Sequence, residues 1–146
     1  MATPNTQPIY TKTIINEKAT LTTEVAARDP GSANLVLLHT AGSCGSLITN
    51  IDVYYLGNEV AAKVLFLYQK SATDSKATLI GEATLPVQNP SSASAQTPVS
   101  VTLPPILYGT SKTGILLKAS EEIYVALSVA ADVGFNVIAR GGDYAS

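Results

Sequence analysis

The sequence predicts an all-β chain, an antiparallel β-sandwich that is jelly-roll-like and has about eight to ten strands. Three observations lead to this fold class. Apolar and polar residues alternate with a period of two, as they do in half-buried strands. Turn-forming residues separate the alternating segments at the spacing of strands. No segment sustains the apolar stripe of an amphipathic helix, so crossover helices are lacking and the strands must pair antiparallel.

The expected strands follow one another along nearly the whole chain. They lie near residues 8–15, 18–25, 34–40, 46–56, 61–70, 77–86, 97–103, 115–119, 122–130 and 134–140. The expected turns contain Asp29-Pro30-Gly31, Ala41-Gly42-Ser43, Leu56-Gly57-Asn58, Pro104-Pro105, Tyr108-Gly109 and Gly141-Gly142-Asp143. Residues 59–63 have helical propensity, but they continue directly into an alternating strand, so no helix is expected there.

Alternation also assigns residues to the two faces of a strand. In the segment 46–56, Ile51 and Val53 share one face, and Ile48 is expected on the opposite face. In the segment 61–70, Val64, Phe66 and Tyr68 are expected on one face, opposite Lys63, Leu65, Leu67 and Gln69.

The length and charge of the chain limit its number of domains and its possible partners. The 146 residues fit one domain, and we expect residues 1–7 to form an extended arm and residues 8–146 to form the sandwich. Only 14% of the residues are charged, against about 25% in typical proteins, which predicts that a partner covers part of the surface. The net charge of −2 argues against nucleic acid as a partner, and no apolar run is long enough to span a membrane.

The inventory of reactive side chains is small. One cysteine, Cys44, excludes an intramolecular disulfide, and one histidine, His39, excludes a two-histidine metal site. A hydrolase hypothesis would use Cys44 as the nucleophile, His39 as its base and Asp52 to orient the imidazole. Because Cys44 lies in a Gly/Ser turn, we favour a structural role for it and expect no enzymatic activity.

The carboxylates and tyrosines also give no clear sign of a catalytic or metal site. Glu121 and Glu122 are neighbours on a strand and must point to opposite sides, so they are unsuited to act as an acid pair. A calcium site from Asp132, Asn136 and Asp143 lacks the spacing of a calcium loop, so neither a metal nor another cofactor is expected. The seven tyrosines fit the core or a protein contact, with a carbohydrate platform as the alternative.

Several stretches together resemble a known group of proteins. They are Pro8-Ile9-Tyr10, residues 22–31, residues 40–46, the strand around Ile48, Ile51 and Val53, and the closing Phe135-Asn136-Val137-Ile138-Ala139-Arg140-Gly141-Gly142-Asp143-Tyr144. In this order they resemble small proteins encoded by tailed bacteriophages and prophages among virion structural genes. Cys44 and the loop 88–98 do not belong to that pattern.

The resemblance implies a capsid decoration (cement) protein that is located on the virion and assembled in the host bacterial cytoplasm. Its expected partners are the major capsid protein and further copies of itself, as a homotrimer. The alternative function is a receptor- or glycan-binding module of a phage tail or fibre.

The N-terminal arm is the expected contact segment. Pro4 and Pro8 restrict the residues before them to extended geometry, and an extended strip can add to a neighbouring subunit. The predicted interaction residues are Pro4, Thr6, Pro8 and Tyr10.

Overall fold

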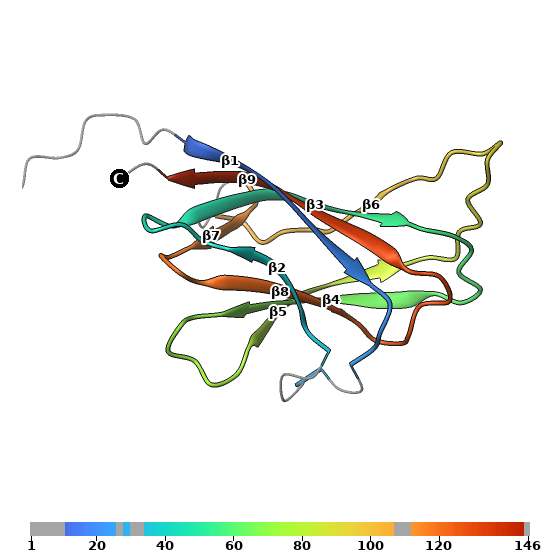
Figure 1. Ribbon diagram of the computed structural model, residues 1–146, viewed down its shortest axis with the longest axis horizontal. Coiled ribbons are helices and arrows are strands. Elements are labelled where there is room, and N and C mark those ends of the chain that lie inside the picture. The colour runs from blue at the N-terminus through green and yellow to red at the C-terminus, as the bar shows by residue number, and fades with distance from the viewer. Residues whose placement is uncertain (1–10, 26–27, 30–33, 107–111, 145–146) are drawn as a thin grey trace, which may run out of the picture.

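A computed structural model describes residues 11–25, 28–29, 34–106 and 112–144, and within these ranges every regular element is a strand (Figure 1). The strands are β1 (Thr11–Leu21), β2 (Val36–Thr40), β3 (Ser46–Tyr55), β4 (Lys63–Lys70), β5 (Thr78–Leu85), β6 (Val99–Ser100), β7 (Ile115–Leu117), β8 (Glu122–Leu127) and β9 (Phe135–Tyr144). The described ranges contain no helix long and apolar enough to cross a membrane.

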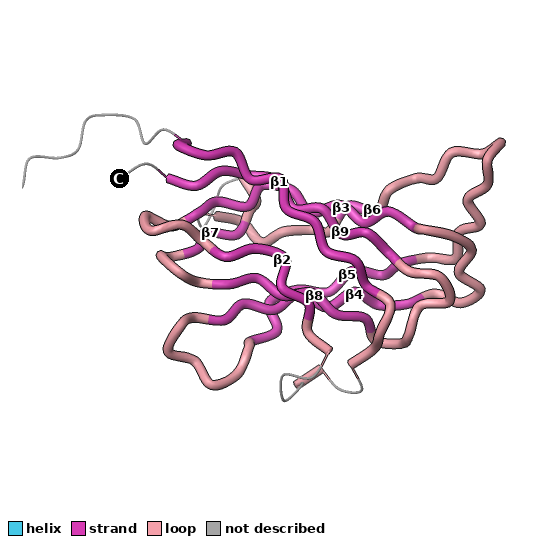
Figure 2. The backbone as a smooth tube through the Cα atoms, viewed as in Figure 1, coloured by secondary structure: helices cyan, strands magenta, loops and turns pink. Residues whose placement is uncertain are grey.

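The strands form two antiparallel sheets that pack face to face (Figure 2). The first sheet has the order β1-β9-β3-β6, with β7 also paired to β3. The second has the order β2-β8-β4-β5. The chain crosses repeatedly between the sheets in jelly-roll fashion, while β4 and β5 form a hairpin within the second sheet and β6 and β7 share one edge position in the first. The predicted fold class is confirmed.

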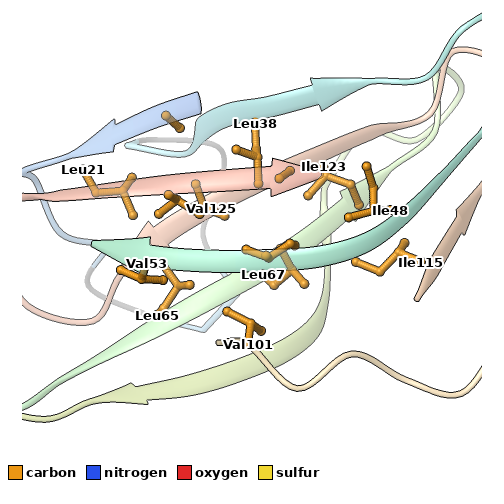
Figure 3. Close-up of a cluster of buried hydrophobic side chains, with 14 of the residues drawn as sticks. Leu21, Leu38, Ile48, Val53, Leu65, Leu67, Val101, Ile115, Ile123 and Val125 are labelled. Atoms are coloured by element: carbon orange, nitrogen blue, oxygen red, sulfur yellow. The ribbon is translucent and has the colours of Figure 1, made fainter. Parts of the chain in front are cut away.

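The core lies between the sheets, where alternate side chains of both inner faces interdigitate (Figure 3). Leu65 and Leu67 of β4 meet Ile51 and Val53 of β3 within one cluster of buried residues. Burying each such side chain contributes roughly 1.5–3 kcal/mol, so this cluster supplies the main driving force for folding.

Two predicted boundaries are wrong. Where the structure describes them, the expected strands 8–15 and 18–25 form one strand, β1. The polar residues Asn16 and Glu17 between them do not mark a turn, because they lie in an edge strand and are exposed to solvent. Likewise Gly141-Gly142 is not a turn but lies inside β9. A Cβ on Gly141 would lie 1.9 Å from the carbonyl oxygen of Leu47, so the glycine permits β9 and β3 to approach there.

A β-bulge in β3 puts Ile48 on a different face from the predicted one. The pairing of β3 with β9 shifts between Ile48 and Asn50, so Thr49 is an extra residue. After this shift Ile48 is buried together with Ile51 and Val53, whereas strict alternation placed it on the other face.

The outer faces of the two sheets differ. On the outer face of the second sheet, Val25 packs in a cluster with Phe66 and Tyr68, and the Arg28 guanidinium lies 5.3 Å from the centre of the Phe66 ring. On the outer face of the first sheet, by contrast, Ile14 remains 83% exposed.

Candidate interaction surface

Three loops meet at one end of the sandwich. Residues 56–62 join β3 to β4, residues 86–98 join β5 to β6, and residues 128–134 join β8 to β9. Figure 1 shows them at the end opposite the start of β1 and the end of β9. This end therefore lies away from the point where the N-terminal arm joins the sandwich.

Exposed apolar side chains gather on these loops. They are Leu56, Val60, Val87, Val129 and Val133, with exposed fractions between 47% and 78%. We call these five residues the apolar platform. They make up five of the eight large hydrophobic residues that are exposed in the described part of the chain. Concentrated exposure of this kind is typical of a contact surface.

The buried Glu59 connects the three loops through hydrogen bonds. Its side chain is fully buried, and its carboxylate accepts hydrogen bonds from the backbone N–H groups of Asp132, Val133 and Gly134 at 2.9, 3.0 and 3.1 Å. Its own backbone N–H donates to the carbonyl oxygen of Gln88 at 3.2 Å. One residue thus links loop 56–62 to both of the other loops.

Lys63 balances the charge of Glu59. The buried Lys63 Nζ lies 2.7 Å from Glu59 Oε2 and 3.2 Å from Asp132 Oδ2. Asp132 also accepts a hydrogen bond from the backbone N–H of Val60 at 3.0 Å. The exposed Val60 is therefore attached to a rigid network of charged and backbone groups.

The network shifts the pKa values of its members. Burial raises the pKa of Glu59, but the hydrogen bonds from Lys63 and from the three backbone N–H groups outweigh burial and lower the pKa to about 2. Burial alone would lower the pKa of Lys63, yet its bonds to Glu59 and Asp132 raise it. Both groups therefore stay charged across the neutral range.

The platform end is nearly free of unmatched charge. The three loops contain two charged residues, Glu59 and Asp132, and both pair with Lys63. Two carboxylates share one ammonium, which leaves a single net negative charge beneath the apolar side chains. A mostly apolar surface suits contact with another protein, and the negative sign gives no attraction to nucleic acid.

The predicted arm residues Pro4, Thr6, Pro8 and Tyr10 lie outside the described residues. Their role therefore remains a prediction.

The structure separates Asp52 from the other residues of the hydrolase hypothesis. Cys44 is exposed in its turn, whereas His39 is buried. Asp52 accepts hydrogen bonds from Ser100 at 2.7 Å and Arg140 at 2.9 Å. It lies six residues along β3 from Ser46, the neighbour of His39, a separation of roughly 20 Å. Asp52 therefore cannot orient the imidazole.

His39 belongs instead to a buried hydrogen-bond cluster. Its Nε2 lies 3.1 Å from Ser46 Oγ, and the Ser46 hydroxyl donates to the Asp143 carboxylate. The serine proton thus points to Asp143 and not to the imidazole, and the Ser46 side chain is fully buried. This arrangement ties β2, β3 and β9 together and presents no accessible nucleophile.

The residues of the calcium hypothesis also lie apart. Asn136 and Asp143 sit near opposite ends of β9, roughly 23 Å from each other, and Asp132 is bound to Lys63. Within the described residues, no group of three metal-binding side chains comes together.

The tyrosine pair follows the expected alternation. Tyr55 is buried against Phe135, with ring centres 4.8 Å apart, while Tyr54 on the opposite face is half-buried. Tyr55 therefore belongs to the core.

Glu59 and Lys63 were not among the predicted site residues, and Asp132 was considered only as a calcium ligand and rejected. Lys63 carried a sequence signal, because alternation placed it on the same face as Leu65, and a buried lysine needs an acidic partner. Glu59 was recognisable only as one end of a short helical pattern, and nothing in the sequence linked either residue to Asp132.

The chain has few detectable relatives. No family model matches it, and no curated protein matches it. Among solved structures, that of the Eiger TNF from S. frugiperda is similar, with a TM-score of 0.42 and 11% sequence identity over 91% of this chain and 96% of that chain. The strand order, and not this likeness, defines the fold class as an antiparallel jelly-roll sandwich.

Proposed function

We propose that this chain is a structural virion protein of a tailed bacteriophage, a capsid decoration or cement protein. It binds the outer surface of the major capsid shell and stabilises the shell. The observation that carries this proposal is the apolar platform, together with the resemblance of the sequence to small phage virion proteins.

The platform suits a permanent contact with a protein shell. Binding normally costs conformational entropy when loops become ordered. Here Glu59 and Lys63 already hold the three loops in place, which reduces that cost. The partner surface is expected to be largely apolar, because the platform end carries only one net negative charge, that of the two carboxylates sharing Lys63.

The proposal assigns the chain no catalytic role and no cofactor. Its partners are the major capsid protein and other copies of the chain, which we expect to form a homotrimer on the capsid surface. A cyclic assembly presents several platforms at once, so weak individual contacts add up to tight binding.

The alternative, a glycan-binding module of a tail or fibre, would be favoured by exposed aromatic side chains at loop tips. The three platform loops contain no aromatic residue. Sugar binding at this end therefore has no supporting feature.

Electron microscopy of particles carrying a label on this protein tests the proposal. We expect the label to be distributed over the capsid. Label confined to the tail or fibres would overturn the proposal.

A further inference from the structure

A row of apolar residues crosses the outer face of the first sheet. The register pairs Ile14 of β1 with Gly142 of β9, Gly142 with Leu47 of β3, and Leu47 with Leu116 of β7. The two ends of the row, Ile14 and Leu116, are 83% and 56% exposed. Four adjacent strands thus present one apolar line that runs across the strand direction.

The middle of this row is hollowed. A depression of about 560 Å³ lies over β1, β9 and β3 and is lined by residues that include Ile14, Leu47, Thr49, Arg140 and Tyr144. Glycines in the interior of a central strand weaken it, and they often mark a place where another backbone approaches closely. Gly142 stands at this position in β9, whereas the neighbouring Gly141 already accommodates the carbonyl oxygen of Leu47.

The charge of the depression is already balanced. Arg140 pairs with Asp52 at 2.9 Å, and Asp52 also accepts a hydrogen bond from Ser100. The remaining polar lining, from Asn16 and Thr49, can bond to a peptide backbone. The depression therefore suits an uncharged, partly apolar peptide segment.

We propose that the depression receives the N-terminal ten residues of a second copy of this chain. These residues, Met1 to Tyr10, contain no charged side chain, and their prolines favour an extended form that docks on apolar and aromatic surfaces. The row spans three strand spacings, roughly 14 Å. The segment from Pro4 to Pro8 spans roughly 12 Å when extended, which is close to that width.

The direction of the chain favours a second copy over the same copy. Thr11 pairs with Tyr144, so β1 begins beside the depression, and the arm would have to reverse at once to enter it. The residues just before Thr11 are Pro8-Ile9-Tyr10, which include neither of the residues, glycine and asparagine, that two-residue hairpin turns favour. Each copy then gives one arm and offers one depression, a head-to-tail contact that forms a ring when the rotation between copies closes. This inference concerns contact between copies and does not depend on binding to a shell.

Photo-crosslinking in the full-length chain tests the inference. Benzoylphenylalanine replaces Thr6, and isotopically heavy and light protein are mixed before irradiation. We expect crosslinks that join heavy to light chains and end in peptides around Ile14, Leu47 or Gly142. Ile14→Asp should lower their yield at least about fivefold, which corresponds to about 1 kcal/mol. Val60→Asp, which changes a similarly exposed residue at the far end, should leave the yield unchanged.

Three results would overturn the inference. They are crosslinks within single chains only, an absence of crosslinks to the depression, and equal yields from the Ile14→Asp and Val60→Asp variants. None of these results bears on shell binding, so the inference and the proposed function can fail separately.

Discussion

Replacing Glu59 by glutamine should strongly destabilise the fold. The substitution keeps the size of the side chain but removes the charge that balances Lys63. It also puts an amide NH₂ group among three backbone N–H donors, those of Asp132, Val133 and Gly134, where a carboxylate oxygen now accepts. At least one donor is then left without an acceptor in a buried position.

The magnitude follows from the environment of the carboxylate. Hydrogen bonding lowers the pKa of Glu59 from 4.5 to about 2, which corresponds to about 3 kcal/mol of stability at neutral pH. Removing one member of a buried ion pair typically costs about 3–5 kcal/mol. We therefore expect the free energy of unfolding to fall by about 3–5 kcal/mol, a large part of the total for a small domain.

Equilibrium unfolding in urea measures this loss. Glu17→Gln is the matched control, because Glu17 is exposed on β1 and its replacement should change stability by less than about 0.5 kcal/mol. A loss below about 1 kcal/mol for Glu59→Gln, or one equal to the control, would refute the role given to the network.

Three further predictions follow from particular residues. Because the pKa of Glu59 in the folded chain lies below 4.5, the Glu59 carboxylate contributes its full share of the folding stability above about pH 4.5 and loses it as the pH falls through about 2. Urea titrations at several pH values should show this loss of stability in the unchanged protein and a smaller loss in Glu59→Gln. Gly141→Ala should lower the melting temperature sharply, because its Cβ would lie 1.9 Å from a carbonyl oxygen. The control Gly81→Ala should leave the melting temperature nearly unchanged, because its Cβ would meet nothing closer than 3.8 Å. Equal melting temperatures for the two variants would contradict the close approach of β9 to β3. Cys44→Ser should leave the melting temperature and shell binding unchanged, and loss of a measurable hydrolytic activity in that variant would contradict the structural role of this exposed turn residue.

The fold class was predictable because its signal is local. The period of two over β3, β4 and β8 defines half-buried strands, and turn residues separate most of them. The errors arose where a contact distant in sequence overrides the local pattern. Gly141-Gly142 has the composition of a turn, and only the approach of Leu47 from β3 makes glycine necessary inside a strand.

The candidate site was less predictable for the same reason. Exposure of Val60 and Val133 depends on where the loops end up after folding, and alternation does not extend into loops. The link from Glu59 to residues 132–134 spans more than 70 positions and uses backbone N–H groups, which have no counterpart in residue identity. Lys63 was the one member of the network whose position in the alternation signalled a buried charge.

The most direct test of the proposed decoration role is the binding of the purified chain to capsids that lack it, prepared from the phage that the proposal expects to encode it. We expect Val60→Asp, which places an unmatched charge on the most exposed residue of the platform, to weaken binding at least about tenfold, or about 1.4 kcal/mol per site. Leu37→Asp, a change at an exposed residue of β2 outside the platform, should bind like the unchanged protein. Superimposable binding curves for Val60→Asp and the unchanged protein would contradict the assignment of the platform as the shell-binding surface.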